Sequence, residues 1–139
     1  MIFVLICALF SVETASAQMQ IPKDTSGKIY QKEEVDEYVD YKGGMKSFNR
    51  LFVSRFNPDI PNKSLFKFVL QCTVEINGEV TDLNVINVET VGLEEAVIEK
   101  NTKEAIRAFG ILKDWIPAVK DGKAVRCIFK LPVTLSTNM

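Results

Sequence analysis

The chain has no histidine and only one tryptophan among its 139 residues. Without histidine, no serine–histidine or cysteine–histidine pair can form, and the commonest general base near neutral pH is absent. The three cysteines alone give no zinc site of ordinary ligand spacing. Carboxylates that could pair, Glu79 with Asp82 and Glu94 with Glu95, fall at a turn and at a helix start, where solvated or capping roles are usual. The composition therefore argues against an enzyme and against a metal or cofactor.

The sequence also lacks an apolar run long enough to cross a bilayer as a helix. Its longest apolar stretch, from Ile2 to Val12, is followed by Ala15-Ser16-Ala17, and this small-x-small triplet is typical of the cleavage site of a secretory leader. We therefore expect residues 1–17 to be a cleaved signal peptide. A retained leader that anchors the protein in the inner membrane, or a buried helix, is the alternative, because no basic residue precedes the apolar stretch.

Neither sign of charge is in excess, since the chain has 17 basic and 18 acidic residues. All of these residues except Glu13 lie beyond residue 17, so the exported chain would be neutral. A neutral domain has no electrostatic reason to bind nucleic acid or an anionic membrane surface. We therefore expect partners of another kind.

The first part of the exported chain carries little periodicity. Residues 18–37 are polar and contain a Thr-Ser-Gly break, which predicts a flexible lead-in. Apolar residues from Met45 to Phe56 then fall on one helical stripe. The stripe follows Gly43-Gly44 and stops at Asn57-Pro58, because a proline disfavours helix at the residue before it. A short amphipathic helix is expected here.

Two strands are predicted on either side of Asn77-Gly78, a dipeptide typical of two-residue hairpin turns because both positions tolerate positive φ. With that turn, Leu70 lies opposite Val85 and Cys72 lies opposite Leu83, and opposed residues share a face of the sheet. The inward face then collects the apolar side chains of Phe66, Phe68, Leu70, Cys72, Val74, Leu83 and Val85.

A second helix is predicted from Leu93 to Phe109, with acids near its start, Arg107 near its end and Gly110 as its stop. A last strand runs from Lys123 to Thr134 after a turn at Asp121-Gly122. Pro132 suits the edge of a sheet better than its middle, because it has no N–H to donate.

The predicted order is thus helix, strand, strand, helix, strand. A hairpin whose second strand feeds a crossover helix can place the last strand beside the first. We therefore expect an α+β domain of αββαβ order, with a three-stranded antiparallel sheet (order 2-1-3) and two helices packed on one face. Cys72 and Cys127 would then face the same core from neighbouring strands. They fit either two buried thiols or a cross-strand disulfide.

Several short motifs occur together along residues 35–135. They are Gly43-Gly44 before the first helix, Ile60-Pro61 before the first strand, "VEINGEVTD" across the hairpin, and "WIPAVKDGKAV" leading into "LPV". In this order and spacing they resemble the C-terminal domain of TonB-type energy transducers, in the form common among Bacteroidetes-like bacteria. Together with the leader and the lead-in inferred above, the resemblance divides the chain into a signal peptide (1–17), the lead-in (18–37) and a TonB C-terminal-like domain (38–137).

The resemblance implies a periplasmic domain that binds TonB-dependent receptors of the outer membrane by accepting an extended receptor segment as an added strand. The residues carried over for this role belong to the last strand and act mainly through their backbone groups. They are Val125, Arg126, Cys127, Ile128, Phe129, Lys130 and Leu131. Trp115, which precedes this strand, is expected to close the fold.

The sequence departs from the family in one respect. Transducers have a membrane-spanning amino end and a long proline-rich spacer, and neither is seen here. We therefore expect a protein-binding module without energy transduction, whose receptor the sequence does not identify. The alternative is a structural or assembly module that forms a homodimer through the same edge strand, because an uncovered strand edge is also a dimerisation template.

Overall fold

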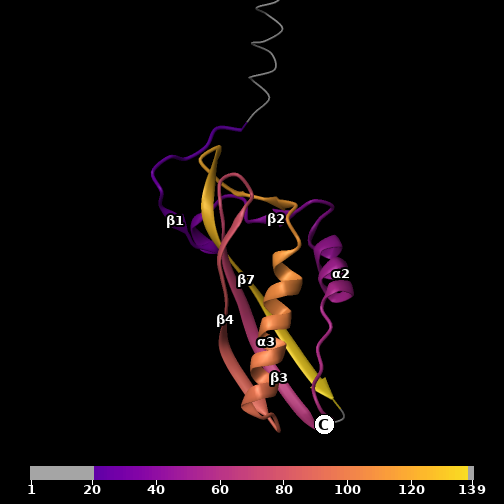
Figure 1. Ribbon diagram of the computed structural model, residues 1–139. Coiled ribbons are helices and arrows are strands. Elements are labelled where there is room, and N and C mark those ends of the chain that lie inside the picture. The colour runs from indigo at the N-terminus through magenta and orange to yellow at the C-terminus, as the bar shows by residue number, and fades with distance from the viewer. Residues whose placement is uncertain (1–20, 138–139) are drawn as a thin grey trace, which may run out of the picture.

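The computed structural model describes residues 21–137, and its two helices and main sheet form an α+β fold (Figure 1). The elements are β1 (Ile29–Tyr30), the 3₁₀ helix η1 (Lys32–Glu34), β2 (Asp40–Tyr41), α2 (Met45–Arg55), β3 (Ser64–Val74), β4 (Val80–Val91), α3 (Glu95–Gly110), β5 (Trp115–Ile116), β6 (Ala118–Lys120) and β7 (Lys123–Thr137). The leader expected at residues 1–17 lies outside the described residues. Between residues 21 and 137 no helix is both long enough and apolar enough to cross a membrane.

The main sheet is mixed, so the prediction of a three-stranded antiparallel sheet is wrong. The three long strands do lie in the expected order, with β3 between β4 and β7 and antiparallel to both. The sheet gains two short strands, since β6 forms a hairpin with the start of β7 and β1 pairs in parallel with β7. β2 and β5 form a separate two-stranded sheet. Strands of two or three residues are too short to show an alternating pattern, which is why the sequence did not predict them.

Both helices are present close to their predicted bounds, and they lie over the same face of the curled sheet (Figure 1). α2 follows Gly43 and Gly44, whose φ values of 86° and 89° favour glycine. α3 ends at Gly110, as predicted. The sequence thus located the helical layer correctly.

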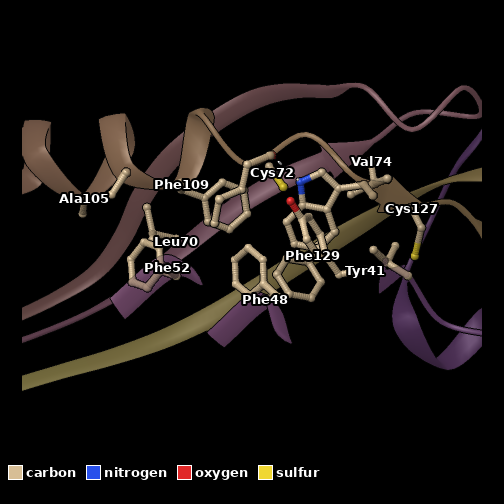
Figure 2. Packing of buried hydrophobic residues seen from close by; sticks show 14 of the residues in the cluster. Tyr41, Phe48, Phe52, Leu70, Cys72, Val74, Ala105, Phe109, Cys127 and Phe129 are labelled. Carbon is tan, nitrogen blue, oxygen red and sulfur yellow. Dashed lines mark hydrogen bonds between the residues drawn. The ribbon is translucent and has the colours of Figure 1, made fainter. Parts of the chain in front are cut away.

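The core lies between the two helices and the inner face of the sheet (Figure 2). Phe48 of α2 is fully buried, and its ring centroid lies 4.8 Å from that of Trp115, 5.5 Å from Phe109 and 6.3 Å from Phe129. These rings come from α2, β5, α3 and β7, so the cluster joins both helices to the sheet. Trp115 also donates its indole N–H to the carbonyl of Leu112 at 3.1 Å, which fixes the chain between α3 and the last strand.

The β3–β4 hairpin has a three-residue loop instead of the predicted two-residue one. Glu75 donates its N–H to the carbonyl of Glu79 at 2.8 Å, and Gly78, with a φ of 86°, donates to the carbonyl of Glu75 at 2.9 Å. The predicted pairing of Leu70 with Val85 is present. On either side of this pair the register shifts by one residue at an irregularity, so the two-residue turn gave the correct pairing only in the middle of the hairpin.

Residues 21–37, expected to belong to a flexible lead-in, form β1 and η1 and follow the start of β7. The carbonyl of Pro22 accepts the N–H of Ala124 at 2.8 Å, and Asp24 donates its N–H to the carbonyl of Ala124 at 2.9 Å. Backbone bonding to a strand edge requires no apolar side chains, so this placement left no periodic signal in the sequence.

Candidate functional site: the outer edge of strand β7

β7 has one fully paired edge and one partly paired edge. Its inner edge pairs with β6 at Lys123–Val125 and with β3 at Cys127–Thr137. Backbone groups of successive residues point to opposite edges of a strand, so the even-numbered residues present their N–H and C=O groups at the other edge, here called the outer edge. Ala124 shows this directly, because both its backbone groups bind the N-terminal segment.

The first half of the outer edge is covered by residues 22–38. β1 pairs in parallel with Arg126 and Cys127. Further along, the hydroxyl of Tyr38 donates a hydrogen bond to the carbonyl of Ile128 at 3.3 Å. Burial raises the pKa of Tyr38, so the hydroxyl keeps its proton and remains a donor. The sequence did not point to Tyr38, because a single aromatic residue in a polar segment has no periodicity.

The second half, from Lys130 to Thr137, carries no strand on its outer edge within residues 21–137. By the alternation of the backbone, the N–H groups of Lys130, Thr134 and Ser136 point to this edge, and Pro132 interrupts the series because it has no N–H. All four side chains are exposed. The intervening side chains are partly buried and pack on the core: Leu131, Val133 and Leu135.

The seven residues that the resemblance assigns to partner binding span both halves. The core side takes Val125, Cys127, Phe129 and Leu131, of which the first three are buried. The opposite side takes Arg126, Ile128 and Lys130. Of these last three, only Lys130 lies beyond the stretch that pairs with β1 and bonds Tyr38 through its carbonyl, and its backbone N–H faces the Tyr38 hydroxyl. The structure thus places most of the expected stretch beneath the N-terminal segment, while the unpaired edge continues beyond it.

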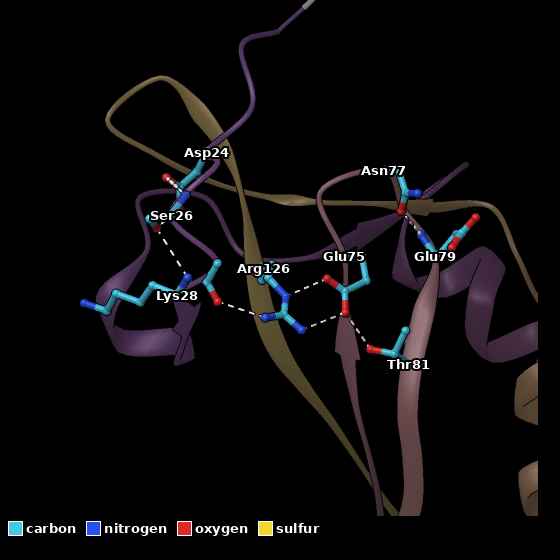
Figure 3. A network of polar contacts seen from close by, with 9 residues as sticks. Asp24, Ser26, Lys28, Glu75, Asn77, Glu79, Thr81 and Arg126 are labelled. Atoms are coloured by element: carbon cyan, nitrogen blue, oxygen red, sulfur yellow. Dashed lines mark hydrogen bonds and ion pairs between the residues drawn. The ribbon is translucent and has the colours of Figure 1, made fainter.

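Arg126 belongs to a polar network at the covered end of the edge (Figure 3). Its Nε and Nη2 donate to the two carboxylate oxygens of Glu75 at 2.6 and 3.1 Å, and its Nη1 donates to the carbonyl of Gly27 at 2.8 Å. The hydroxyl of Thr81 donates to Glu75 at 2.6 Å. The guanidinium of Arg126 lowers the pKa of Glu75, so the carboxylate stays ionised. The network joins the turn that follows β3, strands β4 and β7, and the N-terminal segment.

Both cysteines of the described chain are buried free thiols. The register pairs Cys72 with Phe129 and Cys127 with Val74, so the two cysteines lie diagonally across the strands. Diagonal neighbours are about 7–8 Å apart, and a disulfide usually joins Cα atoms about 4.4–6.8 Å apart. Burial raises the pKa of Cys72 to about 12 and that of Cys127 to about 11, so neither is a thiolate near neutral pH. The arrangement is that of two packed thiols.

Concavities elsewhere are lined in part by charged side chains, several of which form ion pairs. One lies between α3 and the chain after α2, and there Lys100 pairs with Asp59 at 3.0 Å and Arg107 with Glu104 at 2.8 Å. A shallow one of about 180 Å³ lies beside the outer edge of β7, lined by Gln31, Lys32, Glu33, Tyr38, Ile128 and Lys130. In the part of the chain that the structure describes, no three histidine, cysteine, aspartate or glutamate residues gather as a metal site.

In comparisons with known proteins, no protein-family model, no curated protein and no solved structure matches the chain. What the chain does must therefore be inferred from its own residues.

Proposed function

We propose that the protein is an exported binding module of the TonB C-terminal type, which engages an outer-membrane receptor by accepting an extended receptor segment as a strand added to β7. The observation that carries the proposal is the outer edge of β7, whose half from Lys130 to Thr137 has no partner strand within residues 21–137. An extended peptide can satisfy the N–H and C=O groups of such an edge with its own backbone. The motifs that resemble TonB domains supply the class of partner.

The opposite edge of the sheet, on β4, is less suited to this role. Asp82 and Asn87 of β4 have positive φ values of 52° and 54°, and they lie beside the two register shifts with β3. Bulges bend a strand away from regular pairing and are a common protection of exposed edges. β7, by contrast, pairs with β3 without any shift along its length. A regular strand therefore fits β7 better than β4.

The side chains of β7 indicate what a partner segment needs. On the helical side, an added strand would extend the apolar row of Leu131, Val133 and Leu135. On the opposite side it would lie beside exposed residues such as Lys130 and Thr134. An extended segment that alternates apolar and polar side chains satisfies both conditions.

The proposal is tested by titrating isotope-labelled protein with synthetic peptides that copy the extended amino-terminal segments of TonB-dependent receptors. We expect amide shifts centred on Thr134 and Ser136. A matched control peptide with proline at alternate positions should cause none, because it lacks the main-chain donors. No shift along residues 123–137 at about millimolar peptide contradicts the proposal.

The same outer edge also suits pairing with β7 of a second copy, because β7 is a regular strand without bulges in its pairing with β3. Sedimentation over a range of protein concentrations separates this second function from the first. A dimer that forms without peptide, with protection of Thr134 and Ser136, supports a self-pairing module. A monomer at all concentrations contradicts it.

A further inference from the structure

The segment Pro22–Tyr30 occupies the half of the outer edge that the partner strand would also need. It binds Ala124 through two backbone hydrogen bonds of 2.8 and 2.9 Å, and its β1 portion then pairs in parallel with β7. We propose that this segment is an internal competitor strand, and that an incoming receptor segment displaces it, together with the Tyr38 hydroxyl at Ile128, to gain the outer edge from Ala124 to Thr137. The inference rests on the proposed function, and it adds a way in which the same edge is controlled.

The competitor segment is held by few contacts. Only Asp24 and Tyr30 are half-buried, no residue from 22 to 30 is fully buried, and Ile29 of β1 is 38% exposed. None of the fully buried core residues comes from this segment. Segments with exposed backbone bonds and few buried apolar contacts open locally at small free-energy cost. The segment can therefore leave the edge while the core stays folded.

The competitor segment is also an imperfect strand. From Lys23 to Ile29 it advances by six residues, while its partner β7 advances by only two, from Ala124 to Arg126. The intervening residues therefore loop away from the edge, and Gly27 in this loop has a φ of 81°. A receptor segment without such a loop can bond to every outward group of β7 along the same stretch. The receptor segment would therefore form more backbone hydrogen bonds to β7 than the competitor segment does.

Arg126 provides a contact that either strand can use. Glu75 holds its Nε and Nη2, while Nη1 donates to the carbonyl of Gly27 at 2.8 Å. Because Glu75 fixes the guanidinium, Nη1 stays at the edge when the competitor segment leaves. It can then donate to a carbonyl of the replacing strand.

Two variants of the full chain separate displacement from a general disturbance. The release variant carries Asp24→Pro, which removes the N–H donor to Ala124, and Gly27→Val, which places a β-branched residue at a left-handed φ. A Cβ at position 27 meets no atom within 4 Å, so the positive φ of the backbone is the source of strain at this position. The matched control carries Thr25→Val alone, which places the same β-branched residue at an exposed position of the segment that has no part in these contacts.

Hydrogen exchange at the amide of Ala124 and affinity for the receptor-segment peptides are then measured for both variants and the wild type. We expect the release variant to lose protection at Ala124, to keep its unfolding midpoint, and to bind peptide at least about tenfold more tightly, because an edge free in about a tenth of the molecules weakens the apparent affinity by that factor. The control variant should behave as the wild type.

Each other outcome overturns the proposal in a distinguishable way. Lost protection with unchanged peptide affinity means that segment and peptide do not compete, and strand addition on the uncovered half then stands. Retained protection at Ala124 in the release variant means that the segment is not held by the contacts described. Absence of peptide binding by all three proteins overturns strand addition itself, and the competitor role with it.

Discussion

The substitution Phe48→Ala removes the ring at the centre of the aromatic cluster. Phe48 is fully buried, and the ring centroids of Trp115 and Tyr41 lie 4.8 and 5.3 Å from its own. Burial of a phenylalanine side chain contributes about 1.5–3 kcal/mol by transfer from water, and the cavity left behind raises the cost of Phe→Ala to about 3–5 kcal/mol. We expect a value near the upper end, because the surrounding rings are fixed on both helices and the sheet and cannot close the cavity.

The assay is urea unfolding followed by the fluorescence of Trp115, the only tryptophan of the chain, together with far-ultraviolet circular dichroism. The urea concentration at the unfolding midpoint should fall. The slope of the unfolding free energy against urea concentration should stay constant, since the surface exposed on unfolding hardly changes. Val53→Ala in the same helix is the control, because that side chain is 72% exposed and its loss should change the free energy of unfolding by less than about 0.5 kcal/mol. A loss below about 1.5 kcal/mol for Phe48→Ala would refute the tight packing of α2 on the sheet.

Three further predictions concern polar and sulfur groups. Asn101→Ala should lower the free energy of unfolding by about 1–3 kcal/mol or more, because its buried amide bonds the N–H of Asp59 at 2.7 Å and the carbonyl at 3.0 Å; an unchanged thermal midpoint contradicts this. The hydrogen-bonded guanidinium of Arg107 holds the pKa of Glu104 at about 2, below the ordinary 4.5. The stability that the ionised carboxylate contributes above pH 4.5 is therefore lost as the pH falls toward 2. Glu104→Gln should make the urea unfolding midpoint less dependent on pH between these values, and an unchanged dependence contradicts the prediction. Cys72 and Cys127 should react with a thiol reagent only after unfolding, without reductant, whereas a disulfide would leave them unreactive.

Most of the structure that the sequence predicted correctly lies in long segments with periodic apolar residues. The helices Met45–Arg55 and Glu95–Gly110 and the three long strands follow from regular spacing of apolar residues over many positions. The apolar pattern did not predict the burial of Asn101 in the second helix, because its side chain is polar and is buried through hydrogen bonds to the backbone of Asp59. Backbone and side-chain bonds between distant segments have no period, and the sequence could not show them.

The candidate site was predictable in one respect and not in another. Alternation along the last strand correctly assigned Cys127 and Phe129 to the core and Lys130 to the exterior. Which part of its edge is open depends on where Pro22–Tyr30 and Tyr38 lie, and that is set by tertiary contacts to backbone carbonyls. Pro132 indicated an edge strand, but β1 pairs with β7 at Arg126 and Cys127, so the prediction holds only for the part of β7 from Lys130 onward.

Hydrogen exchange along β7 in the presence of a receptor-segment peptide tests strand addition most directly. The amides of Thr134 and Ser136 point to the outer edge and should exchange more slowly once peptide is bound, while those of Val133 and Leu135 already bond to β3 and should not change. Slowing of alternate amides only is the signature of a strand added on that edge. No slowing at Thr134 and Ser136 at saturating peptide, or slowing confined to β4, would contradict the account.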